Sequence, residues 1–520
     1  MTAALSSVPA AEFVQAKVEY AAVLPMFIVF GVALVGVLVE AFAPRRARYW
    51  IQLGLTLAGL VAAFLVLVLY SREHQAKTAA GAIVVDGPAL FFQGTVLVLS
   101  AVALLAMAER LDGREADTFT QSGSAVPGSP QEAAAVRLGA TSTEVFPLVL
   151  FAVTGMMMFP AAGDLLTMFV ALEVLSLPLY ILTGLARRRR LLSQEASLKY
   201  FLLGAFSSAF FLFGAALVYG FAGSVRFSEI AAAVPQVAGL DSLAVPGVIL
   251  IAVGLLFKVG AVPFHSWTPD VYQGAPTPVT GFMAACTKVA AFGALLRVLY
   301  VAFEGLRWNW QPVIAVIAAL TMVVGAVLSV TQTDMKRLLA YSSITHAGFV
   351  LVGVLALDRT GVSSTMFYLV TYGFSTIAAF ALIALVRSSG SEATHLSQWV
   401  GLGKSSPVLA GTISFLMLAF AGIPLTSGFT AKFAVFGAAI AHDGTWLAVV
   451  GVLASAVTAF VYVRVIVLMY FSEPTGDTVV ARPSVLTAAA VTICVAATVL
   501  LGIVPSPLLD LAHDSSLFLP

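Results

Sequence analysis

The chain reads Lys258-Val-Gly-Ala-Val-Pro-Phe-His-Ser-Trp-Thr-Pro-Asp-Val-Tyr-Gln-Gly-Ala-Pro-Thr-Pro278 between two apolar segments within Ile249–Tyr300. The first segment carries Lys258, the second carries Lys288, and Pro263 interrupts the chain between them. An ammonium inside hydrocarbon costs roughly 2.5 kcal/mol or more, so such a lysine usually faces a bundle interior or water. A broken helix at membrane depth is tolerated only where protein or water satisfies the freed backbone. The pattern indicates an ion-handling site in a transport protein.

The composition is that of a polytopic membrane protein. Of 520 residues, 60% are hydrophobic and 10% are charged, and the mean hydropathy is +1.00. Charged residues make up about 25% of a soluble globular protein. The formal net charge of +1 gives no sign of nucleic-acid binding. The two cysteines, Cys286 and Cys494, lie in separate apolar segments without the spacing of a disulfide framework, metal site or iron–sulfur cluster. We therefore expect no cofactor in this chain.

Apolar runs of about 20 residues, long enough to cross a bilayer, recur along the chain. They predict an all-α protein of about 14 transmembrane helices, of which the seventh and the twelfth are broken. The predicted spans lie near residues 20–42, 50–70, 88–108, 145–162, 164–186, 197–222, 244–262, 277–303, 311–331, 336–357, 364–386, 406–440, 445–471 and 483–503. The stretch 109–144 is rich in Ser, Gly, Pro and charge and predicts a surface loop.

The basic residues predict the orientation in the membrane. If the N-terminus is outside, the inner loops hold 15 lysines and arginines, among them Lys336 and the run Arg187–Arg190, and the outer loops hold six. Inner loops carry the excess of positive charge in membrane proteins. We therefore expect both termini on the outer side, and we interpret the run Arg187–Arg190 as a topology anchor.

Six of the polar residues within predicted spans could form a proton path through the bundle. They are Glu173, Lys199, Lys258, Lys288, His346 and Lys432. A single lysine could instead reach the membrane surface, but several lysines at mid-span favour an interior role. Glu173 would either be protonated because of desolvation or be ionised beside a cation, for which Lys258 or Lys199 is the natural partner. His346 at such a position is more often a hydrogen-bonded core residue, yet its ring could also pass a proton.

The second half of the chain repeats features of the first. The break Gly260-Ala-Val-Pro-Phe264 is echoed by Ala421-Gly-Ile-Pro-Leu425, and each interrupts an apolar span at proline. Spans 4–8 and 9–13 therefore predict two copies of a five-helix unit, inverted across the membrane because the number of helices is odd. The predicted domains are a three-helix N-terminal segment with the polar loop, two repeats and a C-terminal helix, at residues 1–143, 144–305, 306–472 and 473–520.

Two long motifs resemble those of the antiporter-like membrane subunits of respiratory complex I. They are the stretch from Lys258 to Thr280 and Asp334-Met-Lys-Arg-Leu-Leu-Ala-Tyr-Ser-Ser-Ile-Thr-His-Ala-Gly348. The resemblance extends over most of the chain, from about Thr143 to Tyr470. It implies a proton-translocating membrane subunit of NADH-quinone oxidoreductase, coupled to quinone reduction elsewhere in the complex and located in the bacterial cell (inner) membrane.

The resemblance also implies roles for the polar residues. Glu173 would pair with Lys258. Lys288 would be the central relay, with His346 close to it. Lys432, on the broken twelfth span, would lie on the outlet route as the lysine of the second half.

Further implications concern Lys199, the cofactors and the partners. Lys199 would match a family lysine on the sixth span and belong to the same relay. NADH, flavin (FMN), iron–sulfur clusters and quinone would be held by partner subunits. The partners in the bilayer would be an adjacent antiporter-like subunit and small membrane subunits.

The alternative is a subunit of a multi-subunit cation/proton antiporter, which shares the fold and much of the lysine pattern. A sodium site would need clustered carboxylates or carbonyls at the broken helices, whereas Glu173 is the one carboxylate at mid-membrane in the predicted spans. The sequence therefore favours protons. A purely structural scaffold would leave the buried charges unexplained.

Overall fold

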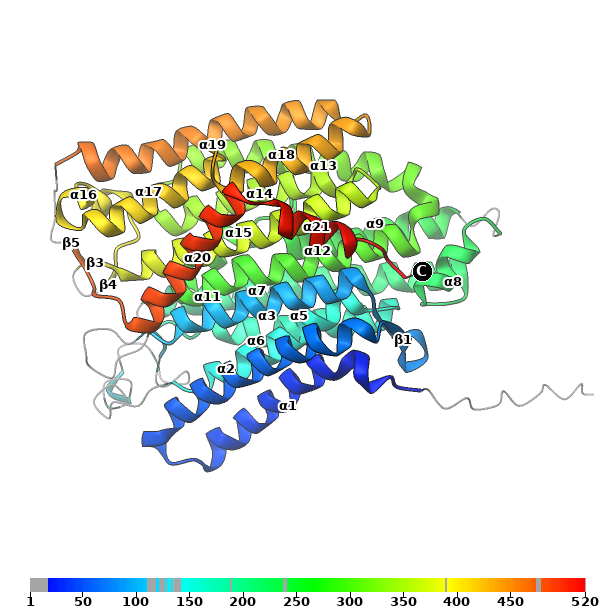
Figure 1. Cartoon of the computed structure of the whole chain (residues 1–520), viewed down its shortest axis with the longest axis horizontal. Coiled ribbons are helices and arrows are strands. Elements are labelled where there is room, and N and C mark those ends of the chain that lie inside the picture. Colours follow the sequence, from blue (N-terminus) through cyan, green and yellow to red (C-terminus); the bar gives the residue numbers. More distant parts are fainter. Residues whose placement is uncertain are drawn as a thin grey trace, which may run out of the picture.

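The computed structural model describes residues 17–109, 118–120, 126, 129–131, 134, 142–187, 189–236, 241–388, 391–473 and 478–519. Most of the predicted loop at 109–144 lies outside them. The described chain is an all-α bundle of helices lying side by side (Figure 1). Twelve helices are long and apolar enough to cross a membrane, with three shorter apolar helices, Val145–Ala161, Pro407–Ala421 and Ser427–Ala441. The last two are halves of one interrupted span, in agreement with the prediction of about 14 spans.

The helices of the first half run from the N-terminus to the span that carries Lys288. They are α1 (Tyr20–Phe42), α2 (Arg45–Leu69), α3 (Gly87–Met107), α5 (Val145–Met158), α6 (Leu165–Thr183), α7 (Arg190–Ala222), α8 (Phe227–Ala233), α9 (Asp241–Val259), α10 (Trp267–Gly274), α11 (Thr277–Phe282) and α12 (Lys288–Arg297). One turn of π-helix, Met283–Thr287, joins α11 to α12, and a second, Val298–Ala302, follows α12.

The second half contains the remaining long spans and a short C-terminal helix. Its helices are α13 (Arg307–Val330), α14 (Met335–Val354), α15 (Arg359–Leu385), α16 (Leu402–Ser405), α17 (Pro407–Ala421), α18 (Ser427–Ala441), α19 (Thr445–Phe471), α20 (Val485–Ile503) and α21 (Ser506–Asp514). Two small antiparallel sheets lie in the connections. One pairs β1 (Ala76–Thr78) with β2 (Ile83–Val85), and the other places β3 (Val386–Ser388) between β4 (Ser391–Glu392) and β5 (Thr478–Val480).

The centre of the bundle is formed by the span Thr277–Ala302 and by α14 and α15. All residues in the central window of Thr277–Ala302 are buried (100%), as are 89% of those in α14 and 94% of those in α15. In α20 the buried share is 22%, so this helix faces outward. The spans that carry Lys288 and His346 are therefore, together with α15, the most enclosed of the described spans.

Several of the spans have an aspartate as the N-cap residue. Asp86 accepts a hydrogen bond from the Ala89 amide at the start of α3, at 3.0 Å. Asp164, Asp334 and Asp358 cap α6, α14 and α15 in the same way. A carboxylate at this position satisfies free amides and is stabilised by the helix dipole. These caps explain why the spans begin where the apolar runs begin.

Both ends of the described chain lie at the same end of the bundle (Figure 1). The Glu19 amide donates to Thr78 Oγ1 at 2.7 Å, in the hairpin that precedes α3. The Leu519 amide donates to Asp86 Oδ2 at 2.9 Å, at the start of α3. A chain that crosses the membrane an even number of times has both ends on the same side. That this end faces outward stays a prediction.

Two predicted positions are wrong. Helix α7 begins at Arg190 rather than near residue 197, because the polar residues before the apolar run continue the same helix. Lys336, assigned to an inner loop, lies in the first turn of α14. It is buried, and its ammonium donates to the Ala275 carbonyl at 2.7 Å, at the end of α10. Lys336 therefore ties two spans together instead of anchoring a loop.

Candidate functional site

The first broken span ends in a glycine turn whose backbone is satisfied by protein. Gly260 follows α9 with φ of 81°. The Gly260 amide donates to the Phe257 carbonyl and the Ala261 amide donates to the Leu256 carbonyl, each at 3.0 Å, the pattern of a Schellman motif. The indole of Trp267, at the start of α10, donates to the Phe257 carbonyl at 2.9 Å. The break can therefore stand at membrane depth without exposed polar backbone.

The second broken span ends in the same way. Gly422 follows α17 with φ of 85°, and the amide of Ile423 donates to the Leu418 carbonyl at 3.1 Å. Here a lysine satisfies the remaining carbonyls: Lys432 Nζ, on α18, donates to Phe420 O at 2.9 Å and to Ala421 O at 2.8 Å. A cation is stabilised at the C-terminus of a helix by its dipole. The two breaks share the same glycine turn, which supports the predicted repeat. The inversion of the two copies across the membrane stays a prediction.

Lys258 lies in the last turn of α9, buried among aromatic and hydroxyl groups. Its ammonium donates to Ser176 Oγ at 2.7 Å and to the Tyr200 hydroxyl at 3.2 Å. It also lies 5.1 Å from the centre of the Tyr200 ring and 5.7 Å from that of Tyr180. Ring faces attract cations, so these contacts replace part of the lost hydration.

Glu173 lies on α6, one turn before Ser176, within electrostatic range of Lys258. No ion pair between them occurs among the described residues, and Glu173 Oε1 is buried without a hydrogen-bond partner. The predicted direct pairing therefore differs from the arrangement in the structure. The reason is local: the Ser176 hydroxyl occupies the position beside the ammonium.

Lys288 is the first residue of α12, directly after the π-helical turn. Its buried ammonium donates to the Ser343 carbonyl of α14 and lies 5.5 Å from the centre of the Tyr372 ring. Single π turns inside helices often occur at functional sites. The turn was not predicted, because it leaves no trace in the apolar pattern.

His346 lies between two tyrosine hydroxyls. Nδ1 is 2.6 Å from the Tyr368 hydroxyl, and Nε2 is 3.4 Å from the Tyr462 hydroxyl. The Tyr462 hydroxyl is also 2.5 Å from Ser342 Oγ. His346 is within electrostatic range of both Lys288 and Lys432, and it is the titratable group that stands between them.

Helix α14 connects Lys288 with Lys432. Its residues Ser343, His346 and Phe349 follow one another at one-turn spacing, so they share a face. The first binds Lys288, and the ring centre of Phe349 lies 5.0 Å from Lys432 Nζ. Lys432 also donates to Ser455 Oγ at 2.7 Å. The fold thereby brings together three of the predicted residues, Lys288, His346 and Lys432.

Lys199 does not belong to this buried group. Its side chain is 43% exposed and pairs with Glu195 at 2.7 Å and with Asp270 at 2.8 Å. Asp270 in turn pairs with Arg337 at 2.6 Å. The early start of α7 explains the difference, since Lys199 lies nine residues after Arg190, near the helix end rather than at mid-span.

Sequence reasoning missed the tyrosines that line the site. Tyr200, Tyr368 and Tyr462 contact Lys258 or His346 through their hydroxyls, and Tyr372 covers Lys288 with its ring. One signal was present: Tyr368 and Tyr372 are four residues apart in an apolar span and so face the same way. A tyrosine is uncharged and fits within an apolar run, so a search for charged residues in the predicted spans does not find it.

The comparisons with known proteins cover nearly the whole chain. Residues 162–458 match the family described as NADH:quinone oxidoreductase/Mrp antiporter, TM. The chain is 58% identical over 521 residues to NADH-quinone oxidoreductase subunit N from Rhodococcus opacus, with 96% of each chain covered. It is 60% identical over 504 residues to the protein of the same name from Acidothermus cellulolyticus, with 96% of this chain and 97% of the relative covered.

Solved structures share the fold. A chain of respiratory complex I from Thermus thermophilus with bound aureothin is 32% identical, with a TM-score of 0.75 over 94% of this chain and 99% of that one. A chain of the Mrp complex from Dietzia sp. has a TM-score of 0.78 over 95% and 97%. Its identity is 22%, so this likeness concerns the fold alone.

Proposed function

Since the chain belongs to the NADH:quinone oxidoreductase/Mrp antiporter family of membrane proteins, we propose that it is a proton-translocating membrane subunit of NADH-quinone oxidoreductase. It is a multi-pass membrane protein, and its relatives at 58% and 60% identity are subunits of that oxidoreductase. The protein is thus part of a multi-subunit membrane complex.

The proton path rests on one observation. The three lysines of the proposed path, Lys258, Lys288 and Lys432, are buried and donate to hydroxyl and carbonyl oxygens, and none of the three forms an ion pair among the described residues. An ammonium that leaves water without a carboxylate partner loses part of the stabilisation of its charge. Each lysine is therefore poised to give up and regain a proton when the field around it changes.

The proposed path runs from Lys258 to Lys288 and then through His346 to Lys432. The second part is connected by α14 and by the hydroxyls on the His346 ring. Between Lys258 and Lys288, transfer requires bridging water, which carries hydrogen bonds nearly as well as a direct contact. Glu173 acts at a distance on Lys258, and Lys199 stands at the periphery of the path.

The remaining parts of the proposal concern cofactors, partners and location. We place NADH, FMN, iron–sulfur clusters and quinone in partner subunits, and we expect this chain to hold no redox centre. The partners are an adjacent antiporter-like subunit and small membrane subunits. The location is the bacterial cell (inner) membrane, with both termini on the outer side.

The alternative function, a subunit of a cation/proton antiporter, is compatible with the family match and with the fold. The Mrp chain has the higher TM-score but the lower identity of 22%. The relatives at 58% and 60% identity carry the name of the oxidoreductase subunit instead. We therefore prefer the oxidoreductase.

The test is to replace a buried lysine in the complex purified from native membranes. We expect Lys258→Ala and Lys288→Ala to assemble normally but to lower NADH-dependent turnover and the number of protons moved per NADH. The matched control is Lys404→Ala, because Lys404 is exposed. A normal proton stoichiometry in an assembled lysine variant would overturn the path. Purification without NADH oxidation, but with cation-dependent proton exchange, would overturn the assignment to the oxidoreductase.

A further inference from the structure

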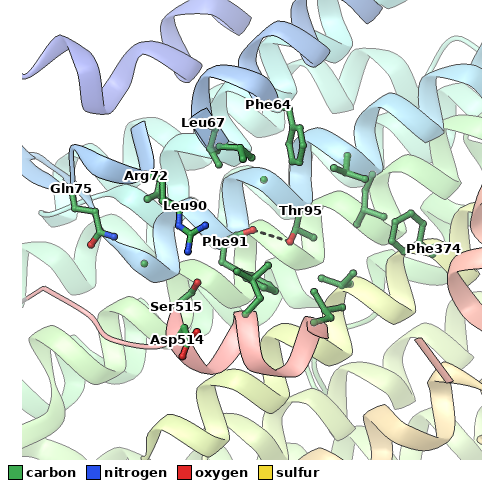
Figure 2. Close-up of a pocket in the computed structure, with 18 residues that line it drawn as sticks. Phe64, Leu67, Arg72, Gln75, Leu90, Phe91, Thr95, Phe374, Asp514 and Ser515 are labelled. Atoms are coloured by element: carbon green, nitrogen blue, oxygen red, sulfur yellow. Dashed lines mark hydrogen bonds between the residues drawn. The ribbon is translucent and has the colours of Figure 1, made fainter. Parts of the chain in front are cut away.

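A largely apolar cleft lies away from the lysine path, between α2, α3, α15 and α21. Its cavity volume is about 380 Å³, within the roughly 300–1,000 Å³ typical of sites for small molecules. Phe64, Leu67, Phe91 and Phe374 line its body. Figure 2 shows these apolar side chains above the α21 ribbon, with Arg72, Gln75, Asp514 and Ser515 at one end.

The polar end of the cleft carries two opposite charges. Arg72 follows α2, and Asp514 ends α21 (Figure 2). Both side chains are exposed, and neither forms a hydrogen bond or ion pair with any residue that the structure describes. Asp514 also lies at the C-terminus of its helix, where the dipole disfavours an anion. A cation beside Asp514 and an anion beside Arg72 would therefore both be stabilised.

The depth of the cleft matches one membrane leaflet. Gly87, at its polar end, begins α3, and Val98, at its apolar end, lies eleven residues further along that helix. At 1.5 Å per residue this separation is about 16 Å. The hydrocarbon core of a bilayer is about 30 Å thick, so one leaflet spans about half of it. The polar end lies where α2 ends and α3 begins, at the membrane surface.

We propose that this cleft binds one zwitterionic aminophospholipid, such as a phosphatidylethanolamine. The phosphate contacts the Arg72 guanidinium, the ammonium contacts the Asp514 carboxylate, and one acyl chain lies along α3. An arginine matches a phosphate through several N–H donors. An anionic phospholipid has no cationic group in its headgroup, so its negative charge would be repelled by the Asp514 carboxylate.

The experiment uses the complex that contains this chain, purified and placed in phosphatidylcholine vesicles. A trace of phosphatidylethanolamine with a photoreactive diazirine in one acyl chain is added, and phosphatidylglycerol with the same chain serves in a parallel sample. After illumination, labelled peptides are mapped. We expect the ethanolamine probe to label peptides of α3 and α21, about ten-fold more than the glycerol probe, as expected for one charge-assisted contact.

Variants separate the charges from the apolar body. Gly94→Phe should abolish the label, because a side chain at Gly94 points between Leu67 and Phe64 with room for a first carbon. Arg72→Gln should reduce the label about ten-fold, and Asp514→Asn should remove the preference for ethanolamine over glycerol. If Gly94→Phe fails to assemble, the two charge variants still decide the question, because both residues are exposed. The control variant is Arg359→Gln, because Arg359 is exposed and lies outside the cleft. It should be labelled to the same extent as the unaltered chain.

Three results would overturn the proposal. Equal labelling by both probes in the unaltered chain would show that the charges do not select the headgroup. Stronger labelling by the glycerol probe would assign the cleft to an anionic lipid. Absence of label from α3 and α21, with photoproducts on a neighbouring subunit instead, would show that a partner covers the cleft.

Discussion

At the scale of single residues, His346 lies within electrostatic range of both Lys288 and Lys432, two of the three lysines of the path. A neutral imidazole donates from one ring nitrogen and accepts at the other. With the Tyr368 hydroxyl at 2.6 Å from Nδ1 and the Tyr462 hydroxyl at 3.4 Å from Nε2, both nitrogens have partners. A proton crosses the ring when one nitrogen takes a proton from its hydroxyl partner and the other nitrogen gives its proton to the second hydroxyl. The first hydroxyl then regains a proton from its other side, and the second releases one.

Removal of these hydroxyls should slow the relay. We expect Tyr368→Phe and Tyr462→Phe each to lower coupled turnover about ten-fold, the equivalent of one lost hydrogen bond of about 1.4 kcal/mol. The measurement is NADH-driven proton uptake in vesicles containing the assembled complex. Tyr300→Phe is the matched control, because the Tyr300 hydroxyl donates to Val354 O, away from the path. Equal rates for all three variants would argue against a role of the histidine.

Glu173 acts without touching Lys258, and its substitution tests the electrostatic part of the mechanism. Glu173→Gln keeps the shape and removes the charge, so we expect lower coupled turnover with normal assembly. The effect should be smaller than the roughly 4 kcal/mol of a charge pair in contact near a protein surface. Glu195→Gln is the control, since Glu195 pairs with Lys199 at the exposed side. If the two variants have the same turnover, the field of Glu173 does not reach the path.

The sequence identified the lysines and missed the tyrosines for one physical reason. A charge within an apolar run is costly and stands out, which singled out Lys258, Lys288 and Lys432. A tyrosine is compatible with such a run and becomes visible only when a fold brings its hydroxyl to a partner. For Lys199 the sequence wrongly predicted a buried position. The start of its helix was placed too late, so a charge near the exposed helix end was assigned to the membrane interior.

At the scale of elements, the two broken spans are variants of one motif. Each ends in a glycine with positive φ, and the carbonyls left free are satisfied by Trp267 in the first and by Lys432 in the second. The breaks could be predicted, because proline within an apolar run is a strong signal. The hydrogen-bond donors could not, because they come from the following helix segment and depend on how it folds back.

Gly422 is the position at which this motif can be tested. A Cβ there would meet Lys432 Nζ at 3.3 Å, and the positive φ adds roughly 1–2 kcal/mol of strain for alanine. We expect Gly422→Ala to displace the ammonium and to lower proton pumping at normal assembly. Gly223→Ala tests the strain alone, and Gly437→Ala tests the added methyl alone, since neither has a neighbour within 4 Å. Pumping loss in a control as large as in Gly422→Ala would refute the specific contact.

At the scale of the whole molecule, a buried ion pair joins the C-terminal segment to the core. Arg297 and Asp86 pair at 2.5 Å with 1% and 0% of their side chains exposed. Arg297 also donates to the Pro160 carbonyl, and Asp86 accepts from the Leu519 amide. Arg297 was recognisable as a charge within a span. Its partner was not, because a single sequence does not say which span ends meet.

This pair should matter for stability rather than for transport. Removing one partner of a buried pair leaves an uncompensated charge and typically costs about 3–5 kcal/mol, whereas removing both charges costs far less. We therefore expect Arg297→Met to lower the temperature at which the assembled complex loses activity. The double variant with Asp86→Asn should recover part of that loss, because asparagine keeps the helix cap without the charge. A double variant less stable than Arg297→Met would mean that the carboxylate is stabilised by other groups and that the ion pair is not what holds α3, α12 and the C-terminal segment together.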